Sequence, residues 1–495
     1  MTEHMVVPGE KIRCHPSIIV ERSLSGVVLL AFLVTRFEGT PVAAVLLAAI
    51  VALLLFYYRQ WKLTTIRFNE AEIVVERDTL FKMKKTLPYT KIASVNVNRG
   101  IINRLFGTSR LQININSGSS ATVPEAVLTF RRDLADELRS TISEHLYGQE
   151  IAPDEDKAVE PLVSFSPVDV IIHGLFSVST YQTFVGSLFL AYSVFELYTS
   201  MGTGFGADGK ALISLLIFVA VQVGPSISLI LRYYNYRVYR RGETIYLEHG
   251  LLRTYKTSFE VSRVNAIRVK QTLIARLMHR SCIEAEVVGL ASGSGESLRP
   301  ILCLLKDDAT QQRLLEELVP EFVDGHARER QPEEAKGVLL VRAAIASLVL
   351  VLAAAYPSVY VYRETAAIPG IAGTVLPFAL PLATAAAALA ICYATYVSYR
   401  VTEFGTGADL FSFVNGAVDR ETVVMNYDKV QMVRITQGPV ARLFGVARGR
   451  VYLLSAVGGA SVSSGYFAGS RLAAIGETVM ERIASGEYDW RKNSV

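Results

Sequence analysis

Charge and cysteine are both scarce in this sequence. Only 19% of its 495 residues are charged, whereas 51% are hydrophobic. This balance excludes an ordinary soluble protein of this length and favours a membrane protein. The four cysteines stand apart without a CxxC pair, and Cys14 has an adjacent histidine but no further ligand. The sequence therefore predicts reduced thiols, with no metal site and no cofactor.

Catalytic motifs are lacking as well. The chain contains no P-loop, GxSxG or HExxH motif, and its seven histidines are dispersed. Glycine-rich stretches at 202–206 and 405–407 do not open a helix behind a strand, so we interpret them as turns. These absences favour a non-enzymatic protein, and we expect no nucleic-acid partner.

What the sequence does contain is one motif in three copies, clearest at 429–450. Each copy opens with a basic residue and carries an arginine followed by leucine 13 positions later (104 − 91, 276 − 263 and 442 − 429). We call the first residues the opening bases and the second the repeated arginines. The opening bases are Lys91, Arg263 and Lys429, and the repeated arginines are Arg104, Arg276 and Arg442. The chain is therefore a tandem triplication.

The pattern around each copy predicts a small β-barrel or sandwich closed by a helix. Residues 93–98 alternate between apolar and polar, as a half-buried strand does. A strand is expected before each copy (72–76, 244–248 and 409–413), and another after the first and third (111–115 and 450–454). Amphipathic stretches that predict terminal helices follow at 131–147, 307–322 and 470–485.

Long apolar runs come in pairs, and each pair precedes one repeat. The runs are 24–35 and 41–58, 168–198 and 211–231, and 338–360 and 374–398. A bilayer core needs about 20 helical residues, so we expect six spans in three hairpins, although the first run is short. The hairpin loops carry only Arg36, Lys210 and Arg363, each near an acid, whereas more basic residues gather at the opposite ends of the hairpins. The positive-inside rule therefore predicts that both termini and all three repeats lie in the cytoplasm.

The expected organisation is a membrane α+β protein built from three repeats of a transmembrane hairpin and a cytosolic domain. It comprises an N-terminal segment 1–22, hairpins 23–58, 167–231 and 338–398, domains 59–147, 232–323 and 399–488, an acidic linker 148–166, a charged linker 324–337 and a tail 489–495. We expect the three domains to pack against one another.

Residues 437–447, QGPVARLFGVA, resemble the motif of bacterial pleckstrin-homology-like (PH-like) domains of the second type. Lys91 and Lys429, each two residues after a tyrosine, and Gly250 and Gly416 fit the same pattern. Three such domains behind hairpins resemble the YdbT-like bacterial membrane proteins. The resemblance implies a multi-pass protein of the bacterial inner membrane, linked to protection against membrane-active peptides and envelope stress. The middle copy departs from it, with Met-His at 278–279 in place of Phe-Gly.

The repeated arginines and the opening bases are the candidate contacts to anionic lipid headgroups or to a partner protein. The alternative makes the repeated arginines structural ties, and we favour it because the degenerate middle copy keeps its arginine. Three further lysines, Lys82, Lys84 and Lys85, are candidates of the same kind, and protection of an edge strand is the competing interpretation.

Two polar residues fall within the second predicted hairpin. His173 lies early and Glu196 late in the run 168–198. Such residues can mark a proton or ligand path, and interfacial packing is the alternative. The leading hypothesis is a scaffold associated with membrane lipids, with a membrane protein or a second copy as a further partner. The alternative is a transporter or lipid-moving protein with a path between the hairpins.

Overall fold

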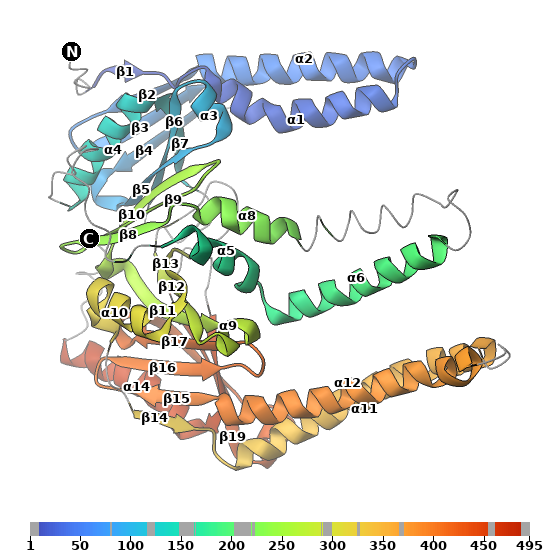
Figure 1. Ribbon diagram of the computed structural model, residues 1–495. Helices are drawn as coiled ribbons and strands as arrows, with labels where there is room; N and C mark the ends of the chain where they lie inside the picture. The colour runs from blue at the N-terminus through green and yellow to red at the C-terminus, as the bar shows by residue number, and fades with distance from the viewer. Residues whose placement is uncertain are drawn as a thin grey trace.

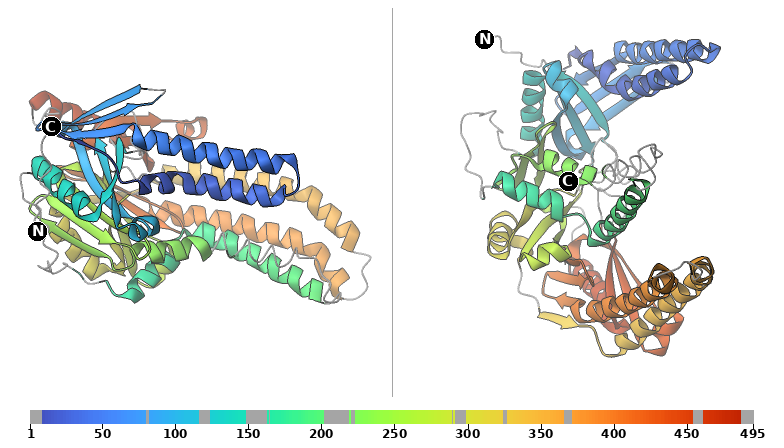
Figure 2. Two further views of the ribbon diagram at one scale, coloured as in Figure 1. Left: turned by 90° about the horizontal axis from the view of Figure 1, so that it is seen from above. Right: turned by 45° about the vertical axis from the view of Figure 1, so that its right-hand side comes forward.

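Three similar units follow one another in a row, and the helices of all three leave the row on the same side (Figures 1 and 2). The computed structural model describes residues 9–79, 82–115, 124–147, 163, 165–201, 219, 223–288, 290, 299–323, 327–365, 371–453 and 461–486. We call residues 9–147 unit 1, residues 163–323 unit 2 and residues 327–486 unit 3.

Unit 1 shows the complete pattern: a helical hairpin, a first sheet, a second sheet and a closing helix. Its first elements are β1 (Lys11–Ile12), α1 (Ser17–Arg36), α2 (Pro41–Lys62), β2 (Thr64–Phe68), β3 (Glu72–Asp78) and β4 (Lys82–Pro88). A one-turn 3-10 helix (Tyr89–Lys91) then leads to β5 (Ile92–Arg99), α3 (Ile101–Leu105), β6 (Thr108–Ile115), β7 (Ala126–Arg131) and α4 (Arg132–Tyr147).

Unit 2 repeats this order after its helical segment, of which the structure describes three helices. They are α5 (Pro167–Phe176), α6 (Thr180–Met201) and α8 (Gly224–Tyr233). The first sheet holds β8 (Arg237–Arg241), β9 (Thr244–His249) and β10 (Thr254–Glu260), and the second holds β11 (Val264–Gln271), β12 (Arg280–Val287) and β13 (Ile301–Asp307). Helix α9 (Leu273–Leu277) connects β11 to β12, and α10 (Asp308–Leu318) follows β13.

Unit 3 begins with a strand and two long helices. They are β14 (Ala327–Arg330), α11 (Glu334–Thr365) and α12 (Ile371–Val401). The sheets then follow as β15 (Glu403–Thr406), β16 (Leu410–Asn415) and β17 (Arg420–Asn426), and as β18 (Val430–Thr436), β19 (Val446–Leu453) and β20 (Ser461–Ala468). Helix α13 (Pro439–Leu443) connects β18 to β19, and α14 (Gly469–Ser485) closes the unit.

Each unit is a sandwich, and the described strands form no closed barrel, because neighbouring units share sheets. Strand β5 of unit 1 pairs with β10 of unit 2, so the sheet order is β7-β6-β5-β10-β9-β8. In the same way β11 of unit 2 pairs with β17 of unit 3 within the order β13-β12-β11-β17-β16-β15-β14. Two antiparallel joints therefore fuse the three predicted domains into one row.

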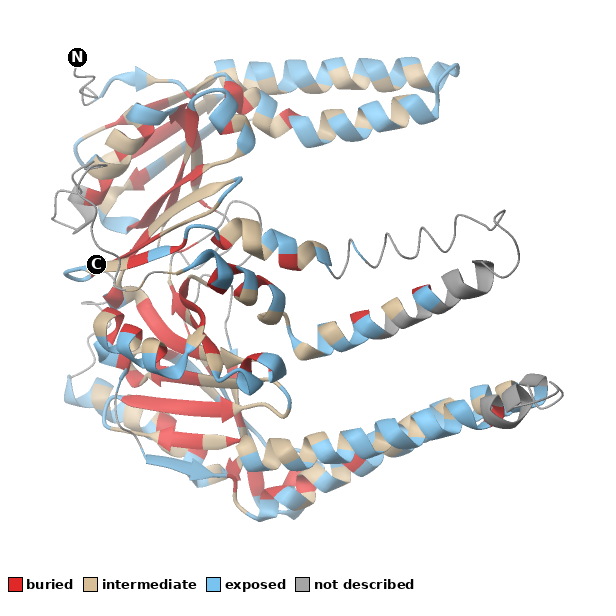
Figure 3. Cartoon of the chain, in the orientation of Figure 1, coloured by how far each residue is buried: buried red, intermediate tan, exposed pale blue. Residues whose placement is uncertain are grey.

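Burial follows the alternation of apolar residues along the strands. Each unit has its own core between its two sheets and the closing helix, and large buried aromatic side chains such as Phe130, Phe259 and Phe413 fill it. The hairpin helices are exposed over most of their length despite being apolar (Figure 3). This contrast is expected when lipid, and not protein, covers the helices.

Four described helices are long and apolar enough to cross a membrane. They are Ser17–Arg36, Pro41–Lys62, Glu334–Arg363 and Pro377–Val401. The predicted run 168–198 is not one helix, because the chain breaks between α5 and α6. Helix α6 begins where the backbone N–H of Thr180 donates to Asp419 of unit 3 (2.9 Å). Most of the predicted run 211–231 lies outside the described residues.

The charged linker predicted at 324–337 is not a solvated connector throughout. Its residues 327–330 form β14, which pairs with the outer strand β15 of the first sheet of unit 3. Glu329 of this strand binds Arg471 of the closing helix (3.1 Å), so the charges fasten an edge strand. Strand β1 covers the equivalent edge in unit 1. Most of the acidic linker 148–166 lies outside the described residues.

Candidate membrane-proximal site

The repeated motif forms the same short helix in each unit. Helices α3, α9 and α13 connect the first two strands of the second sheets, and Figure 1 shows α3 and α9 on the side from which the hairpins leave. Helix α3 contacts α1, and α13 contacts α11. The leucine after each repeated arginine is among the most exposed apolar side chains: Leu105 is 81% exposed, Leu277 75% and Leu443 85%.

Local backbone geometry explains how the degenerate middle copy keeps this helix. Gly107 and Gly445 follow α3 and α13 with positive φ angles of 62° and 69°. His279 takes the same left-handed conformation after α9, with φ of 51°. This conformation costs glycine nothing and strains other residues, so the middle copy preserves the geometry at the expense of backbone strain.

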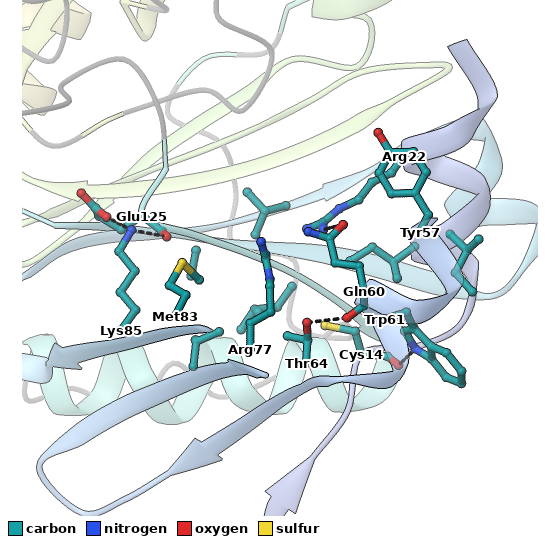
Figure 4. Close-up of a pocket in the computed structure, with 16 residues that line it drawn as sticks. Cys14, Arg22, Tyr57, Gln60, Trp61, Thr64, Arg77, Met83, Lys85 and Glu125 are labelled. Carbon is teal, nitrogen blue, oxygen red and sulfur yellow. Dashed lines mark hydrogen bonds and ion pairs between the residues drawn. The ribbon is translucent and has the colours of Figure 1, made fainter. Parts of the chain in front are cut away.

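A cavity of about 190 Å³ lies in unit 1 between the base of the hairpin and the open end of the sandwich (Figure 4). Helix α1 contributes Ile18, Ile19 and Arg22, and α2 contributes Tyr57, Gln60 and Trp61. Strands β3 and β4 and the segment 125–128 form the remaining walls. The walls combine apolar side chains with several polar and charged groups, and converging polar groups within an apolar surround are typical of a ligand site.

Basic groups outnumber acidic ones in this cavity. Arg22, Arg77 and Lys85 line it, whereas Glu125 is its one acidic side chain. Lys85 forms an ion pair with Glu125. Arg22 donates to the amide oxygen of Gln60 (3.4 Å), and the buried Nε of Arg77 has no partner among the described residues. Among the described residues, neither guanidinium group forms an ion pair with a carboxylate.

Burial, with the nearby charge of Arg22 as the second cause, lowers the pKa of Arg77. An anion between Arg22 and Arg77 would relieve both effects, because an opposite charge favours the charged form of each guanidinium. A phosphate group would fit this role, since planar guanidinium groups bind phosphate oxygens in pairs. The cavity residues that matter here, Arg22 and Arg77, were not among the predicted candidates.

The residues predicted from the sequence lie in three places. Lys82 and Lys84 lie on the outer strand β4, where they form ion pairs with Asp78 (3.2 Å) and Glu76 (3.8 Å). Lys85 of the same strand reaches the cavity instead. The side chains of Arg276 and Arg442 make no ion pair or hydrogen bond within the described part of the chain. The remaining candidates lie near the joints between units.

Two of these candidates contact the neighbouring unit. Arg104 donates a hydrogen bond to the hydroxyl of Thr254 across the joint between units 1 and 2 (2.8 Å). Arg263 donates to the carbonyl of Ile92 across the same joint (3.4 Å). Each opening base, including Lys91 and Lys429, ends a 3-10 turn before the first strand of the second sheet of its unit, which is β5, β11 or β18. The hydrogen bonds of Arg104 and Arg263 are consistent with a structural role, and these positions are equally consistent with contact to a ligand.

The polar residues predicted within the second hairpin are not brought together. His173 is buried in α5, which packs against β13 and α8, and its ring meets Tyr233 edge to face (5.3 Å). Glu196 lies on α6, where its side chain falls outside the described residues. Residue spacing alone could not reveal that α5 packs on the sandwich.

Buried acids fix the hairpins to their units. Glu21 of α1 pairs with Arg110 of β6 (2.5 Å) and accepts from Asn103 of α3. Asp169 of α5 pairs with Arg280 and Lys306 of unit 2 (3.2 and 2.7 Å). The short helices and the cavity are therefore held at fixed positions relative to the apolar helices.

The sequence profile of the bacterial PH domain matches the chain three times, over residues 25–146, 185–318 and 338–485. The chain belongs to the bacterial PH domain family. A curated relative of this bacterial PH protein is the UPF0699 transmembrane protein YdbT of Bacillus subtilis (strain 168). The two are 20% identical over 449 residues, which cover 85% of this chain and 84% of the relative. No solved structure matches the chain.

The resemblance inferred from residues 437–447 is therefore confirmed, as is the fold class of three PH-like domains in a membrane α+β protein. Apolar helices and a transmembrane relative place this bacterial PH protein in a membrane.

Proposed function

We propose that this protein is a non-enzymatic scaffold of the bacterial inner membrane whose three PH-like units bind anionic lipid headgroups from the cytoplasmic side. The observation that carries the proposal is the exposed arginine–leucine pair in the same short helix of every unit. Helices α3 and α13 contact hairpin helices, and α9 adjoins the start of α6, where the backbone N–H of Leu273 donates to Thr180. Leucine gains free energy by entering the membrane interface, and arginine by contact with phosphates.

Basic residues at the points where the hairpins meet the units support a cytoplasmic location of the units. Arg59 and Lys62 end α2, Arg232 ends α8, and Arg400 ends α12. The positive-inside rule assigns such ends to the cytoplasm. The leaflet on that side carries most of the anionic lipid that these residues and the repeated arginines would meet.

A scaffold requires fixed distances between its binding points. The two shared sheets supply them, because each joint is a ladder of backbone hydrogen bonds and not a flexible linker. Three headgroup contacts in one row would bind together more strongly than any single contact. A protein that holds lipids in this way would resist membrane-active peptides by restraining the lipids of the membrane that they disrupt.

The test measures thermal unfolding of the full chain in detergent with short-chain phosphatidylglycerol or phosphatidylcholine. A ligand that binds the folded state raises the unfolding temperature. We expect the anionic lipid to raise it more than the neutral one, and salt to reduce the difference. The triple variant Arg104→Ala, Arg276→Ala and Arg442→Ala should lose most of this difference.

The matched control removes two arginines from the closing helices, Arg313→Ala and Arg471→Ala, and should respond to lipid as the wild type does. Arg77→Gln tests the cavity separately and should remove part of the effect. An equal response of the triple variant and the wild type to anionic lipid would overturn the proposal. It would leave the repeated arginines as structural ties.

A further inference from the structure

The two joints between units use one register. In the joint between units 1 and 2, Thr254 pairs with Arg99. Thr254 lies nine residues before the opening base of unit 2, and Arg99 lies eight residues after the opening base of unit 1. In the joint between units 2 and 3, Arg420 pairs with Gln271, and the two residues lie at the same distances, nine before and eight after, from the opening bases of their units. A single strand-pairing geometry therefore occurs twice in the chain.

Strand β18 is the third member of this series, but among the described strands no other strand pairs with its joint-forming edge. It corresponds to β5 and β11, and among the described strands it pairs with β19 alone. Met432 is 49% exposed, whereas Ser94 and Ala266 at the same position of β5 and β11 are fully buried. An exposed edge with apolar side chains is a template for another strand.

The sequence of β18 resembles that of β11 more than that of β5. Both have the opening base followed by valine, and both place arginine five residues after that base, at Arg268 and Arg434. Apolar residues also recur at the fourth and sixth positions. Strand β18 thus offers a partner nearly the same pairing surface that β11 offers to β17.

The two arginines differ in what holds them. Arg268 lies between Glu286 of β12 (3.1 Å) and Glu421 of β17 (2.9 Å). No carboxylate pairs with Arg434 in the described part of the chain. Arg434 instead lies opposite Arg450, and the guanidinium groups of Arg450 and Arg434 beside Tyr452 lower the pKa of its hydroxyl. The place that Glu421 takes beside Arg268 is therefore empty beside Arg434.

We propose that β18 receives an acidic β-strand of a second protein, paired antiparallel in the register of the two internal joints, with a carboxylate on Arg434. Addition of a strand to an open edge is a common mode of recognition, in which backbone hydrogen bonds give affinity and side chains give specificity. This inference does not depend on lipid binding, because it rests on the joints alone.

A second copy of this chain is the other occupant to consider, since β4 is the strand that it would offer. Charge argues against it. In the shared register Lys85 would lie opposite Arg434, and Met83 would replace the acid at the position of Glu421. Like charges directly opposite one another destabilise a strand pair. The lysines of β4 protect the unit 1 end of the row, whereas the unit 3 end lacks such protection.

The experiment uses a fluorescent peptide of residues 418–428, VDRETVVMNYD, which contains β17 with its acid. Fluorescence anisotropy measures its binding to the full chain in detergent micelles. We expect saturable binding that falls about tenfold or more when the peptide carries Glu421→Lys. The protein variant Arg434→Glu should lose the native peptide and gain the lysine peptide.

Arg450→Glu is the matched control, because it makes the same charge change on the neighbouring strand. It should bind the native peptide better than Arg434→Glu does, and thermal unfolding shows whether both variants fold. Binding that ignores Arg434→Glu, or no saturable binding, would overturn the proposal. Concentration-dependent oligomers in ultracentrifugation that Lys85→Glu strengthens would also overturn it and assign β18 to a second copy.

Discussion

The two joints share a register but are fastened differently. The joint between units 2 and 3 pairs six residues of β11 with six of β17. The joint between units 1 and 2 pairs three, from Thr254 to Lys256. Side chains of the motif supplement this shorter ladder, since Arg104 and Arg263 both donate hydrogen bonds across it.

The position five residues after the opening base shows the difference most clearly. In β11 it is Arg268, buried between two acids, whereas in β5 it is the buried Asn96, whose amide oxygen has no partner among the described residues. A buried ion pair specifies its partner strictly, because a wrong partner leaves a charge unpaired. A neutral amide accepts a wider range of partner strands, because a wrong partner leaves no charge unpaired. We therefore expect the joint between units 1 and 2 to open first.

The largest expected effect is that of Arg268→Ala. This change leaves Glu421 without its partner and removes one of two cations from Glu286, which is 1% exposed and also bound by Arg299 (2.6 Å). Breaking a buried pair on one side costs roughly 3 kcal/mol. Thermal unfolding of the full chain in detergent measures the loss as a lower melting temperature.

Asn96→Ala makes the matched change in the other joint and should cost below about 1 kcal/mol, because a partly unsatisfied amide contributes little. Equal losses from Arg268→Ala and Asn96→Ala would contradict the comparison. Hydrogen exchange would locate the change, with faster exchange in β11 and β17 expected for Arg268→Ala alone.

A smaller effect is expected from His249 in the joint between units 1 and 2. Its ring stacks on Tyr255 (5.0 Å) and lines, with Asn96 and Asn98, a cavity of about 60 Å³ at this joint. Burial lowers the pKa of His249 from 6.5 to about 4, although its Nδ1 hydrogen-bonds to the carbonyl of Arg232. The folded protein therefore holds this histidine neutral, while the unfolded chain binds a proton below about pH 6.5.

Stability from this residue is present above the unfolded pKa and is lost as the pH falls toward about 4. Between about pH 7.5 and pH 5 the loss is about 2 kcal/mol. The variant His249→Phe keeps a ring in the stack and cannot titrate, so its unfolding free energy should fall less over this range. The same pH slope in both proteins would show that folding does not lower the pKa of His249.

The sequence predicted the units well and their connections poorly. Alternation over 93–98 identified β5, and the repeat fixed the equivalents of Arg104, because both patterns are local. Which strand lies beside β5 depends on residues more than 150 positions away, such as Thr254, and no local pattern carries that information. Arg268 illustrates the limit, since a charged residue in an alternating strand predicts a solvated face and here it is buried.

The cavity of unit 1 could not be predicted from the sequence either, because it depends on contacts between distant segments. Arg22 precedes the first predicted apolar run, and Arg77 follows the strand predicted at 72–76. They meet only because the hairpin folds back onto the sandwich. Similarly, the apolar content of 168–198 predicted one membrane span. The structure instead has two helices there, and Thr180 at the start of the second is hydrogen-bonded to Asp419 of unit 3, which no local pattern indicates.

The smallest expected effect concerns the hydrogen bond from Arg104 to Thr254, and it separates the two roles of the repeated arginine. The pair is exposed, so a double-mutant cycle of Arg104→Ala and Thr254→Val should give a coupling below about 1 kcal/mol. Lipid response in the same samples is the decisive readout. Thr254→Val removes the tie and leaves the guanidinium, so stabilisation by anionic lipid should persist in Thr254→Val and fall in Arg104→Ala. Loss of the lipid response in both variants would mean that the arginine acts only through the joint.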